Sequence, residues 1–254
     1  IWVENENIGT TSEENGEFSI VASANKNLIF SILGFEKRII NASDVSNVIM
    51  KAVSFQLDEV VVAKHFETKK IEIGQISNSA LEAFDNGPRI DVKFFPYQAV
   101  YKKTKYIKKV SLLTDSRIEN ATVKLHFYKA DANGFPGEEL LTKDYIATIQ
   151  KGVVRNGFDL TELNLKMPKT GLFVGFEKLL ISKNKFEKTI VNSNTQKTSI
   201  QVIYYPLVLY NYIERDYLFT FSGGKWNRQM KENNQDNLGK IKGYEPAINL
   251  VLTN

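Results

Sequence analysis

The stretch ATVKLHFYKA, residues 121–130, has the clearest strand pattern in this chain. Its apolar side chains at Val123, Leu125 and Phe127 alternate with the polar or amphipathic side chains of Lys124, His126 and Tyr128. Successive side chains of a β-strand point to opposite faces, so this alternation is typical of a strand with one face against a core. The sequence therefore predicts a half-buried strand here.

Similar strand patterns surround this stretch, and no long helical period occurs in the chain. A run of turn-forming residues, DANGFPG at 131–137, follows the first pattern directly. The other predicted strands of this region are Tyr106–Thr114, Leu141–Ile149, Gly152–Leu160, Gly171–Ser182, Ile200–Tyr212, Tyr217–Ser222 and Ala247–Leu252. We expect long polar loops at Lys183–Lys197 and Lys225–Lys242. About nine strands separated by turns indicate an antiparallel sandwich, and a jelly-roll-like arrangement is the expected type.

The first 63 residues form a second β-rich region with shorter loops. Asn15-Gly16 suits a type I′ hairpin turn, in which both central residues take positive φ. The segment Glu17–Ile20 that follows alternates polar and apolar residues, as a half-buried strand does. One further strand is expected to begin at Trp2. Three more are expected at Asn27–Leu33, Val48–Ala52 and Leu57–Ala63. These patterns predict a small β-sandwich at residues 1–63.

Four short motifs of this region carry a resemblance to a known family. They are Gly9-Thr10, the hairpin Glu14–Phe18, Leu33–Phe35 and the closing run Leu57–Val62. Together they resemble the carboxypeptidase-regulatory-like domain, a transthyretin-like (prealbumin-like) β-sandwich. The resemblance covers about a quarter of the chain and implies an accessory module without catalytic residues.

The same resemblance implies a compartment and a kind of partner. In Gram-negative bacteria this domain often stands at the periplasmic end of outer-membrane proteins, so we expect an exported protein in the periplasm or at the outer membrane. A protein partner at the outer membrane is the expected one. The printed sequence begins with Ile1, inside a predicted strand, whereas such domains usually have an earlier strand. We therefore expect one strand to be missing before Ile1.

Composition changes between the two predicted sandwiches. Residues 64–87 hold lysines, small polar residues and the turn-forming run Asp85-Asn86-Gly87-Pro88 at their end. We expect a linker there, with a short strand at Ile71–Ile73 and one helical turn at Ser79–Phe84. The predicted organisation is thus a domain at 1–63, a linker at 64–87 and a larger jelly-roll-like sandwich at 88–254.

Composition and charge exclude several classes of function. The chain has 254 residues, and its 33 basic residues are nearly balanced by 29 acidic ones, which argues against a nucleic-acid-binding protein. Because it has no cysteine, it has no disulfide, thiolate metal site or cysteine nucleophile. No apolar run reaches the roughly 18 residues that a transmembrane helix needs.

Histidine content argues against a zinc peptidase. Such an enzyme holds its metal with two histidines and a glutamate, whereas the two histidines here, His65 and His126, fall in different predicted domains. No Gly-x-Ser-x-Gly motif marks a serine nucleophile either. We predict no catalytic residue, no cofactor and no metal. A third hypothesis is a hydrolase with an unfamiliar active site that uses the carboxylate of Glu177 or Glu214. For Glu177, a salt bridge to a lysine is the favoured interpretation.

The turn at residues 131–138 has two interpretations. Asp131, Asn133 and Glu138 carry oxygen atoms of the kind that bind calcium. The series of acidic positions typical of a calcium loop is incomplete, so a hairpin turn is the favoured interpretation.

Four residues are candidate contacts for a ligand or a partner. Trp226 lies in a polar, glycine-containing stretch, where an exposed aromatic ring suits a sugar face or a protein interface. Tyr210 and Tyr212 belong to a tyrosine-rich run, for most of which core packing in a β-sandwich is the favoured interpretation. His126 lies on the polar face of its strand, where simple exposure to solvent is favoured.

These observations support two leading hypotheses. The first is a non-enzymatic interaction or scaffold protein of the cell envelope, an accessory subunit of an outer-membrane protein complex that uses exposed β-edges for strand addition. The alternative is a glycan-binding module of a secreted or surface protein.

Overall fold

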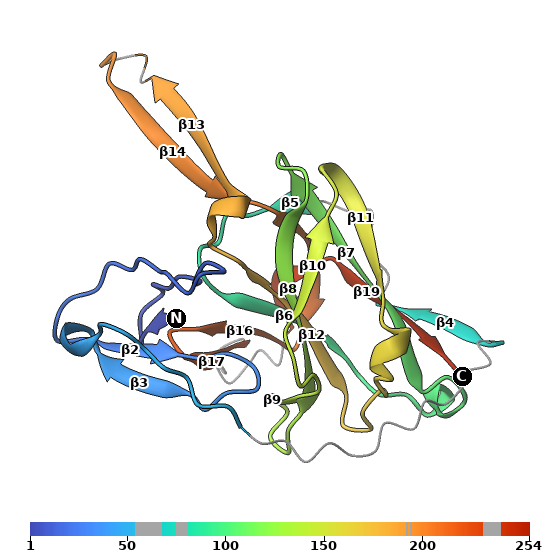
Figure 1. Cartoon of the computed structure of the whole chain (residues 1–254). Helices are drawn as coiled ribbons and strands as arrows, with labels where there is room; N and C mark the ends of the chain where they lie inside the picture. Colours follow the sequence, from blue (N-terminus) through green and yellow to red (C-terminus); the bar gives the residue numbers. More distant parts are fainter. Residues whose placement is uncertain (54–67, 75–80, 192, 194, 231–239) are drawn as a thin grey trace, which may run out of the picture.

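The computed structural model describes residues 1–53, 68–74, 81–191, 193, 195–230 and 240–254 (Figure 1). This part of the chain is all-β, with antiparallel sheets packed as in a sandwich, and its helical segments are short 3-10 turns. The prediction of an all-β fold with sandwich packing is therefore confirmed. None of the described helices is long and apolar enough to span a membrane.

The strands lie in four sheets of different size. Their bounds are β1 Trp2–Val3, β2 Asn27–Phe30, β3 Arg38–Asn41, β4 Lys70–Ile73, β5 Leu81–Ala83, β6 Ile90–Phe95, β7 Tyr106–Ser116, β8 Ala121–Ala130, β9 Pro136–Glu139, β10 Tyr145–Ile149, β11 Gly152–Asp159, β12 Leu172–Lys178, β13 Lys185–Val191, β14 Thr198–Tyr204, β15 Leu207–Arg215, β16 Tyr217–Ser222, β17 Lys225–Met230, β18 Ile241–Pro246 and β19 Ile248–Thr253. The 3-10 turns are η1 Ala42–Asp44, η2 Ala99–Lys103, η3 Thr161–Leu163 and η4 Ser182–Asn184.

Two seven-stranded sheets make the larger part of the molecule, which we call the body (the described residues from 68 to 254). The first sheet has the order β10-β8-β12-β6-β16-β17, with β9 on β8. The second has the order β18-β15-β7-β19-β4, with β11 on β7 and β5 on β15. Strands distant in sequence become neighbours, since β6 pairs with β12 and with β16.

A continuous apolar core fills the space between these two sheets. Val123, Leu125 and Phe127 of β8 point into it, as their alternation predicts, and Phe127 is fully buried. Leu112 of β7 and Leu250 of β19 are equally buried from the second sheet. The polar side chains of β8 therefore lie on the outer face of the first sheet, together with those of β12, β6 and β16.

The N-terminal module (residues 1–53) is a separate, small sheet with the order β1-β2-β3. Its core contains only three buried apolar side chains, those of Val3, Leu28 and Phe30. Half-buried side chains from non-strand segments, such as Phe18 and Val48, pack around them. The module thus buries far less apolar surface than the body does.

The module contacts the body at the turn between β16 and β17. The backbone N–H of Asn5 donates to the carbonyl of Gly223 at 3.0 Å. Gly223 has a positive φ of 60°, and a Cβ there would lie 3.0 Å from the backbone of Glu6. The ring of Trp2 packs edge-on against Phe221, with ring centroids 5.6 Å apart. This joint between module and body needs glycine because the two backbones approach so closely.

Several predicted elements of the module differ in the structure. The segment Glu17–Ile20 alternates in burial, but it belongs to no sheet. The Asn15-Gly16 turn is present, yet only Gly16 takes a positive φ, so the turn is not type I′. Val48–Ala52 makes one isolated bridge, between Ala52 and Phe35. The predicted strand Leu57–Ala63 and His65 lie outside the described residues.

The segment predicted as a linker supplies strands to the body. Within residues 64–87, β4 pairs with β19 and β5 pairs with β15. The short strand expected at Ile71–Ile73 is confirmed as part of β4. The helical turn expected at Ser79–Phe84 is wrong, because Leu81–Ala83 is the strand β5.

Two predicted long loops are also wrong in the body. Residues 183–197 include β13, which forms a hairpin with β14. Residues 225–242 include β17, paired with β16, and the start of β18. The single strand expected at Ile200–Tyr212 is two strands, separated at the Tyr205–Pro206 bond. The sequence patterns do not predict β6, although it lies near the centre of the first sheet.

Candidate functional site

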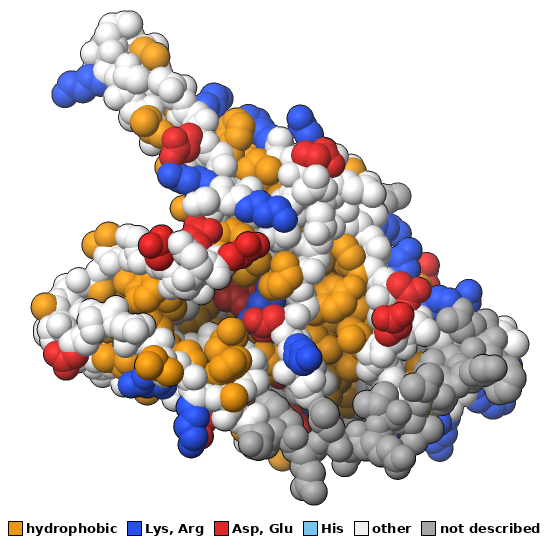
Figure 2. Space-filling model, in the orientation of Figure 1, with side chains coloured by type: hydrophobic (Ala, Val, Ile, Leu, Met, Phe, Trp, Pro, Cys, Tyr) orange, Lys and Arg blue, Asp and Glu red, His pale blue; other side chains and the backbone are white. Residues whose placement is uncertain are grey.

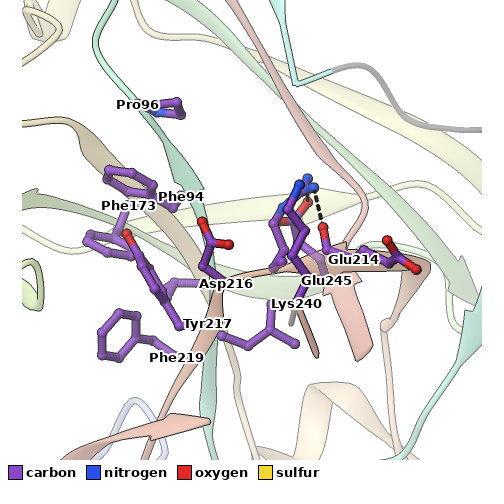
Figure 3. Close-up of a pocket in the computed structure, with 12 residues that line it drawn as sticks. Phe94, Pro96, Phe173, Glu214, Asp216, Tyr217, Phe219, Lys240 and Glu245 are labelled. Atoms are coloured by element: carbon purple, nitrogen blue, oxygen red, sulfur yellow. Dashed lines mark hydrogen bonds and ion pairs between the residues drawn. The ribbon is translucent and has the colours of Figure 1, made fainter. Parts of the chain in front are cut away.

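A cavity of about 430 Å³ opens where strands of both seven-stranded sheets meet (Figure 3). Strands β6, β12, β15, β16 and β18 bring its residues together from distant parts of the chain. The lining residues are Val92, Phe94, Pro96, Phe173, Glu214, Arg215, Asp216, Tyr217, Leu218, Phe219, Lys240 and Glu245. One side of this pocket is aromatic and the other is charged (Figure 3).

The aromatic side follows from strand register. Phe173 of β12 stands opposite Phe94 of β6, and their ring centroids lie 4.6 Å apart. Phe219 of β16 stands opposite Val92 of β6, and its ring meets that of Phe173 at 5.4 Å. Tyr217 shares the face of Phe219 because it lies two residues earlier on the same strand. The rings thus form one connected cluster, in which Phe173 and Phe219 are buried and Phe94 and Tyr217 stay partly exposed to a flat ligand.

A cation already lies over this group of rings. The guanidinium of Arg228, an exposed residue of β17, is 4.6 Å from the centre of the Tyr217 ring and 5.8 Å from that of Phe219. Phe135, from the loop before β9, lies beneath the same guanidinium at 5.9 Å. Such contacts are favourable because the ring face carries negative electrostatic potential.

The charged side is organised around a buried carboxylate. Glu245 is 2% exposed, and Arg215 donates to both of its oxygens at 2.9 Å. Lys93, itself 4% exposed, lies 3.4 Å from Glu245. Burial lowers the pKa of Lys93, although the charge of Glu245 opposes that shift. A buried ion pair with this geometry fixes the wall of the pocket, because each charge needs its partners in place.

Asp216 and Lys240 supply the remaining polar groups of the pocket. Within the described part of the chain, neither side chain makes a hydrogen bond or ion pair. The carboxylate of Asp216 lies between the rings and Glu245 (Figure 3). Glu214, one of the two candidate carboxylates, lies at the rim and pairs with Lys242 at 3.6 Å. The pocket can therefore offer stacking surfaces and hydrogen-bonding groups to one ligand.

His126 is not exposed to solvent but lies within a buried polar network beside β9. It is 6% exposed, with Nδ1 3.0 Å from Glu139 and Nε2 3.1 Å from Glu177. Burial opposes a charge on the imidazole, but the hydrogen bonds to both carboxylates outweigh it and raise the pKa of His126. Tyr128 stacks on His126 and contacts Nδ1 at 3.0 Å.

Glu177 forms the salt bridge to a lysine that the sequence favours. Its carboxylate lies 3.7 Å from Lys124, which also binds Asp144 at 2.8 Å. Burial alone would raise the pKa of Glu177, but His126 and Lys124 lower it to about 2. These charged groups contact one another, so the network ties β8, β9 and β12 together.

The three aromatic candidates lie in different environments, and none lines the pocket. Trp226 is half-buried on β17, between Tyr128 at 5.2 Å and Phe221 at 5.3 Å. Tyr210 is 2% exposed and donates to Asp91 at 2.5 Å, as a core residue. Tyr212 is 47% exposed and packs against Tyr244.

The 131–138 turn is closed by its own hydrogen bonds. Oδ1 of Asp131 accepts from the backbone N–H groups of Asn133 and Phe135, each at 2.8 Å. Glu138 points to Lys129, 3.8 Å away. Among the described residues, no group of three or more histidine or acidic side chains could hold a metal ion.

A second hollow lies in the N-terminal module and can be seen in Figure 2. This groove has a volume of about 1150 Å³ and is lined chiefly by residues 10–22 and 42–48. Phe18, Ile20, Leu28 and Val48 form its apolar floor, while Glu13 and Glu17 are its charged residues. Leu180 and Tyr204 of the body complete the lining.

No protein-family model, curated protein or solved structure matches the chain. The pocket and the groove must therefore be interpreted from their own chemistry. The sequence indicates the groove segments through the alternation of residues 17–20. It gives no sign of the pocket, because Phe94, Phe173 and Phe219 come together only through pairing of β12, β6 and β16.

Proposed function

We propose that the protein is a non-enzymatic interaction protein of the cell envelope, an accessory subunit that binds an outer-membrane protein through its N-terminal module. The resemblance of residues 1–63 to the carboxypeptidase-regulatory-like domain supports the exported location, in the periplasm or at the outer membrane. The groove of the module supports the binding role.

One observation carries the proposal: residues 18–22 alternate in burial as an extended strand does, yet no described strand pairs with them. Phe18, Ile20 and Ala22 pack on the module core, while Ser19 and Val21 point outward, and Val21 is 85% exposed. Among the described residues, no backbone hydrogen bond involves positions 18–22. Unpaired N–H and C=O groups along an extended segment are a template for an incoming strand.

The groove beside this segment determines what the incoming strand must be. Its floor is apolar, so an occupant with apolar side chains at alternate positions would complete the module core. Its charged lining residues, Glu13 and Glu17, are both acidic. We therefore propose an extended segment of a partner protein that combines alternating apolar residues with a basic residue beside them.

A site-specific cross-linking experiment tests this proposal. A photo-reactive residue at Ser19 or Ser46, both beside the groove, is introduced in cells that make the protein natively, and the product is identified in the envelope fraction. We expect one outer-membrane protein cross-linked at both positions. A photo-reactive residue at the exposed Val153, on β11 of the body, serves as the matched control and should not capture it.

Hydrogen exchange of the purified complex then separates strand addition from other contacts. The amides of residues 18–22 should exchange rapidly in the free protein and at least tenfold more slowly in the complex, since each new backbone hydrogen bond protects an amide. A partner that leaves these amides unprotected, or that cross-links equally at Val153, would contradict the proposal.

The pocket on the body supports a second candidate function, glycan binding. The observation that favours it is that the partly exposed rings of Phe94 and Tyr217 and the carboxylate of Asp216 line one pocket, because sugars stack on rings and donate hydroxyl hydrogen bonds to carboxylates.

A polysaccharide array followed by calorimetry tests the second candidate. Asp216→Asn keeps the shape of the pocket and should weaken binding at least tenfold, whereas Tyr212→Ala, outside the pocket, should leave it unchanged. Absence of binding to every polysaccharide, or equal loss in the two variants, would exclude this site.

A further inference from the structure

The hairpin of β13 and β14 projects from the body as an arm (Figure 1). Within the described part of the chain, each strand of this β13–β14 arm pairs only with the other, from Lys185↔Tyr204 to Val191↔Thr198. Two-stranded hairpins are at best marginally stable in water, and a third strand or another packing surface is needed for independent stability. The arm therefore lacks part of what normally stabilises a sheet.

The two edges of the arm differ in chemistry. β13 carries Lys185, Glu187 and Lys188, and charged residues of this kind protect an edge from pairing with other strands. β14 has the sequence TSIQVIY, without a charge, a proline or a glycine. Ile200 and Val202 of β14 are 66% and 40% exposed. The edge of β14 is therefore the one open to strand addition.

We propose that β14 pairs with β14 of a second copy of this chain, antiparallel, so that two arms form one four-stranded sheet. A two-fold axis through Gln201 pairs β14 with the identical strand of the second copy, with Gln201 opposite Gln201. Ile200 then stands opposite Val202 of the second copy, and Val202 opposite Ile200 of the second copy. The axis is perpendicular to the sheet, so all four β-branched side chains share one face.

The sequence favours a second copy over an unrelated strand. The two-fold register places no charged residue opposite another within the β14 pair, and it matches β-branched residues that favour cross-strand contact. The charged strands β13 become the outer edges of the four-stranded sheet and limit it to two copies. Such an isologous contact closes on itself, as most homodimers do. Because one strand pair buries little area, the dimer should be weak, with a micromolar or higher dissociation constant.

Sedimentation velocity over a range of concentrations tests the association. The wild-type chain should shift from monomer to dimer at high micromolar concentration. Ile200→Lys places a charge in the centre of the contact and should weaken dimerisation at least tenfold. Thr189→Lys is the matched control, since Thr189 stands opposite Ile200 on β13 and would lie outside the new pair. A chain that stays monomeric, or an equal effect of both variants, would overturn the proposal.

Cross-linking by a single cysteine tests the register. The chain has no cysteine, so a disulfide can form only between introduced residues. Residues opposite each other on antiparallel strands have Cα atoms about 4.5–5.5 Å apart, within the range of a disulfide. Gln201→Cys should therefore yield a covalent dimer under mild oxidation, at least tenfold faster than Lys188→Cys, its cross-strand neighbour on β13. Equal rates would refute the two-fold β14 pair, and a partner protein bound to the arm in place of a second copy would refute it as well.

Discussion

The body and the N-terminal module are both built of antiparallel β-strands, but only the body has two sheets that cover a common core. In the body, two seven-stranded sheets cover a common core, in which side chains such as Phe127 and Leu250 are fully buried. In the module, three short strands cover a core of three buried residues, and the extended segment 18–22 joins no sheet. Apolar alternation alone therefore does not make a segment pair with a neighbour, since residues 17–22 have the pattern of a strand but join no sheet.

The largest expected effect comes from the core of the body. Phe127→Ala removes a fully buried ring and should lower the free energy of unfolding by about 3–5 kcal/mol, because a cavity replaces it. Phe30→Ala, its counterpart in the module, should cost less and melt the module locally. Urea unfolding, followed by circular dichroism and by amide exchange, measures both. Equal, global destabilisation by the two variants would show that module and body unfold as one unit.

Buried charge provides the second comparison. Glu245→Gln leaves Arg215 and Lys93 without their carboxylate, and removing one partner of a buried pair typically costs about 3–5 kcal/mol. In the module, Glu36 and Lys51 form an ion pair whose side chains are 51% and 76% exposed. Glu36→Gln should therefore change stability by less than about 1 kcal/mol. Thermal unfolding of both variants checks the contrast, which fails if the two losses are similar.

The sequence predicts strands that have a local apolar pattern and misses strands that are recognised only by their pairing with distant segments. The strands β7, β8 and β16 can be predicted because their alternation or apolar content is local. β13 and β17 are polar strands, and only pairing with β14 and β16 shows that they are strands.

The candidate residues follow the same division. The alternation correctly places His126 on the polar face of β8, but its two carboxylate partners come from β9 and β12, so its burial could not be foreseen. The sequence predicts a loop around Trp226, whereas β17 places this ring between Tyr128 and Phe221.

The stability of the body should also depend on pH, because the His126 network belongs to it. The pKa of His126 is raised in the folded state, so its contribution is fully present below the unfolded value of about 6.5 and is lost as pH rises through the folded value. The pKa of Glu177 is lowered to about 2, so its contribution is lost as pH falls from about 4.5 to 2.

The measurement is the free energy of unfolding from pH 3 to pH 9 for wild type and His126→Gln. The difference between the two should be largest near pH 5 to 6 and should shrink above the folded pKa. A difference that does not change with pH would show that the pKa of His126 is the same in the folded and unfolded protein.

The smallest expected effect concerns the unpaired segment of the module. Val21→Lys changes an outward-pointing side chain that is 85% exposed, so stability should change by less than about 0.5 kcal/mol. The same type of change at the buried Val123 of β8 should unfold the body. Comparison of the two melting temperatures tests whether residue 21 faces away from the core.

The joint between module and body has an optical consequence. The chain contains two tryptophans, and both rings meet Phe221: Trp2 from the module at 5.6 Å and Trp226 from β17 at 5.3 Å. All tryptophan emission of the protein therefore originates at this one contact. Movement of the module away from the turn at Gly223 would expose Trp2 to water and shift its emission to the red, so the protein carries its own fluorescent reporter of that movement.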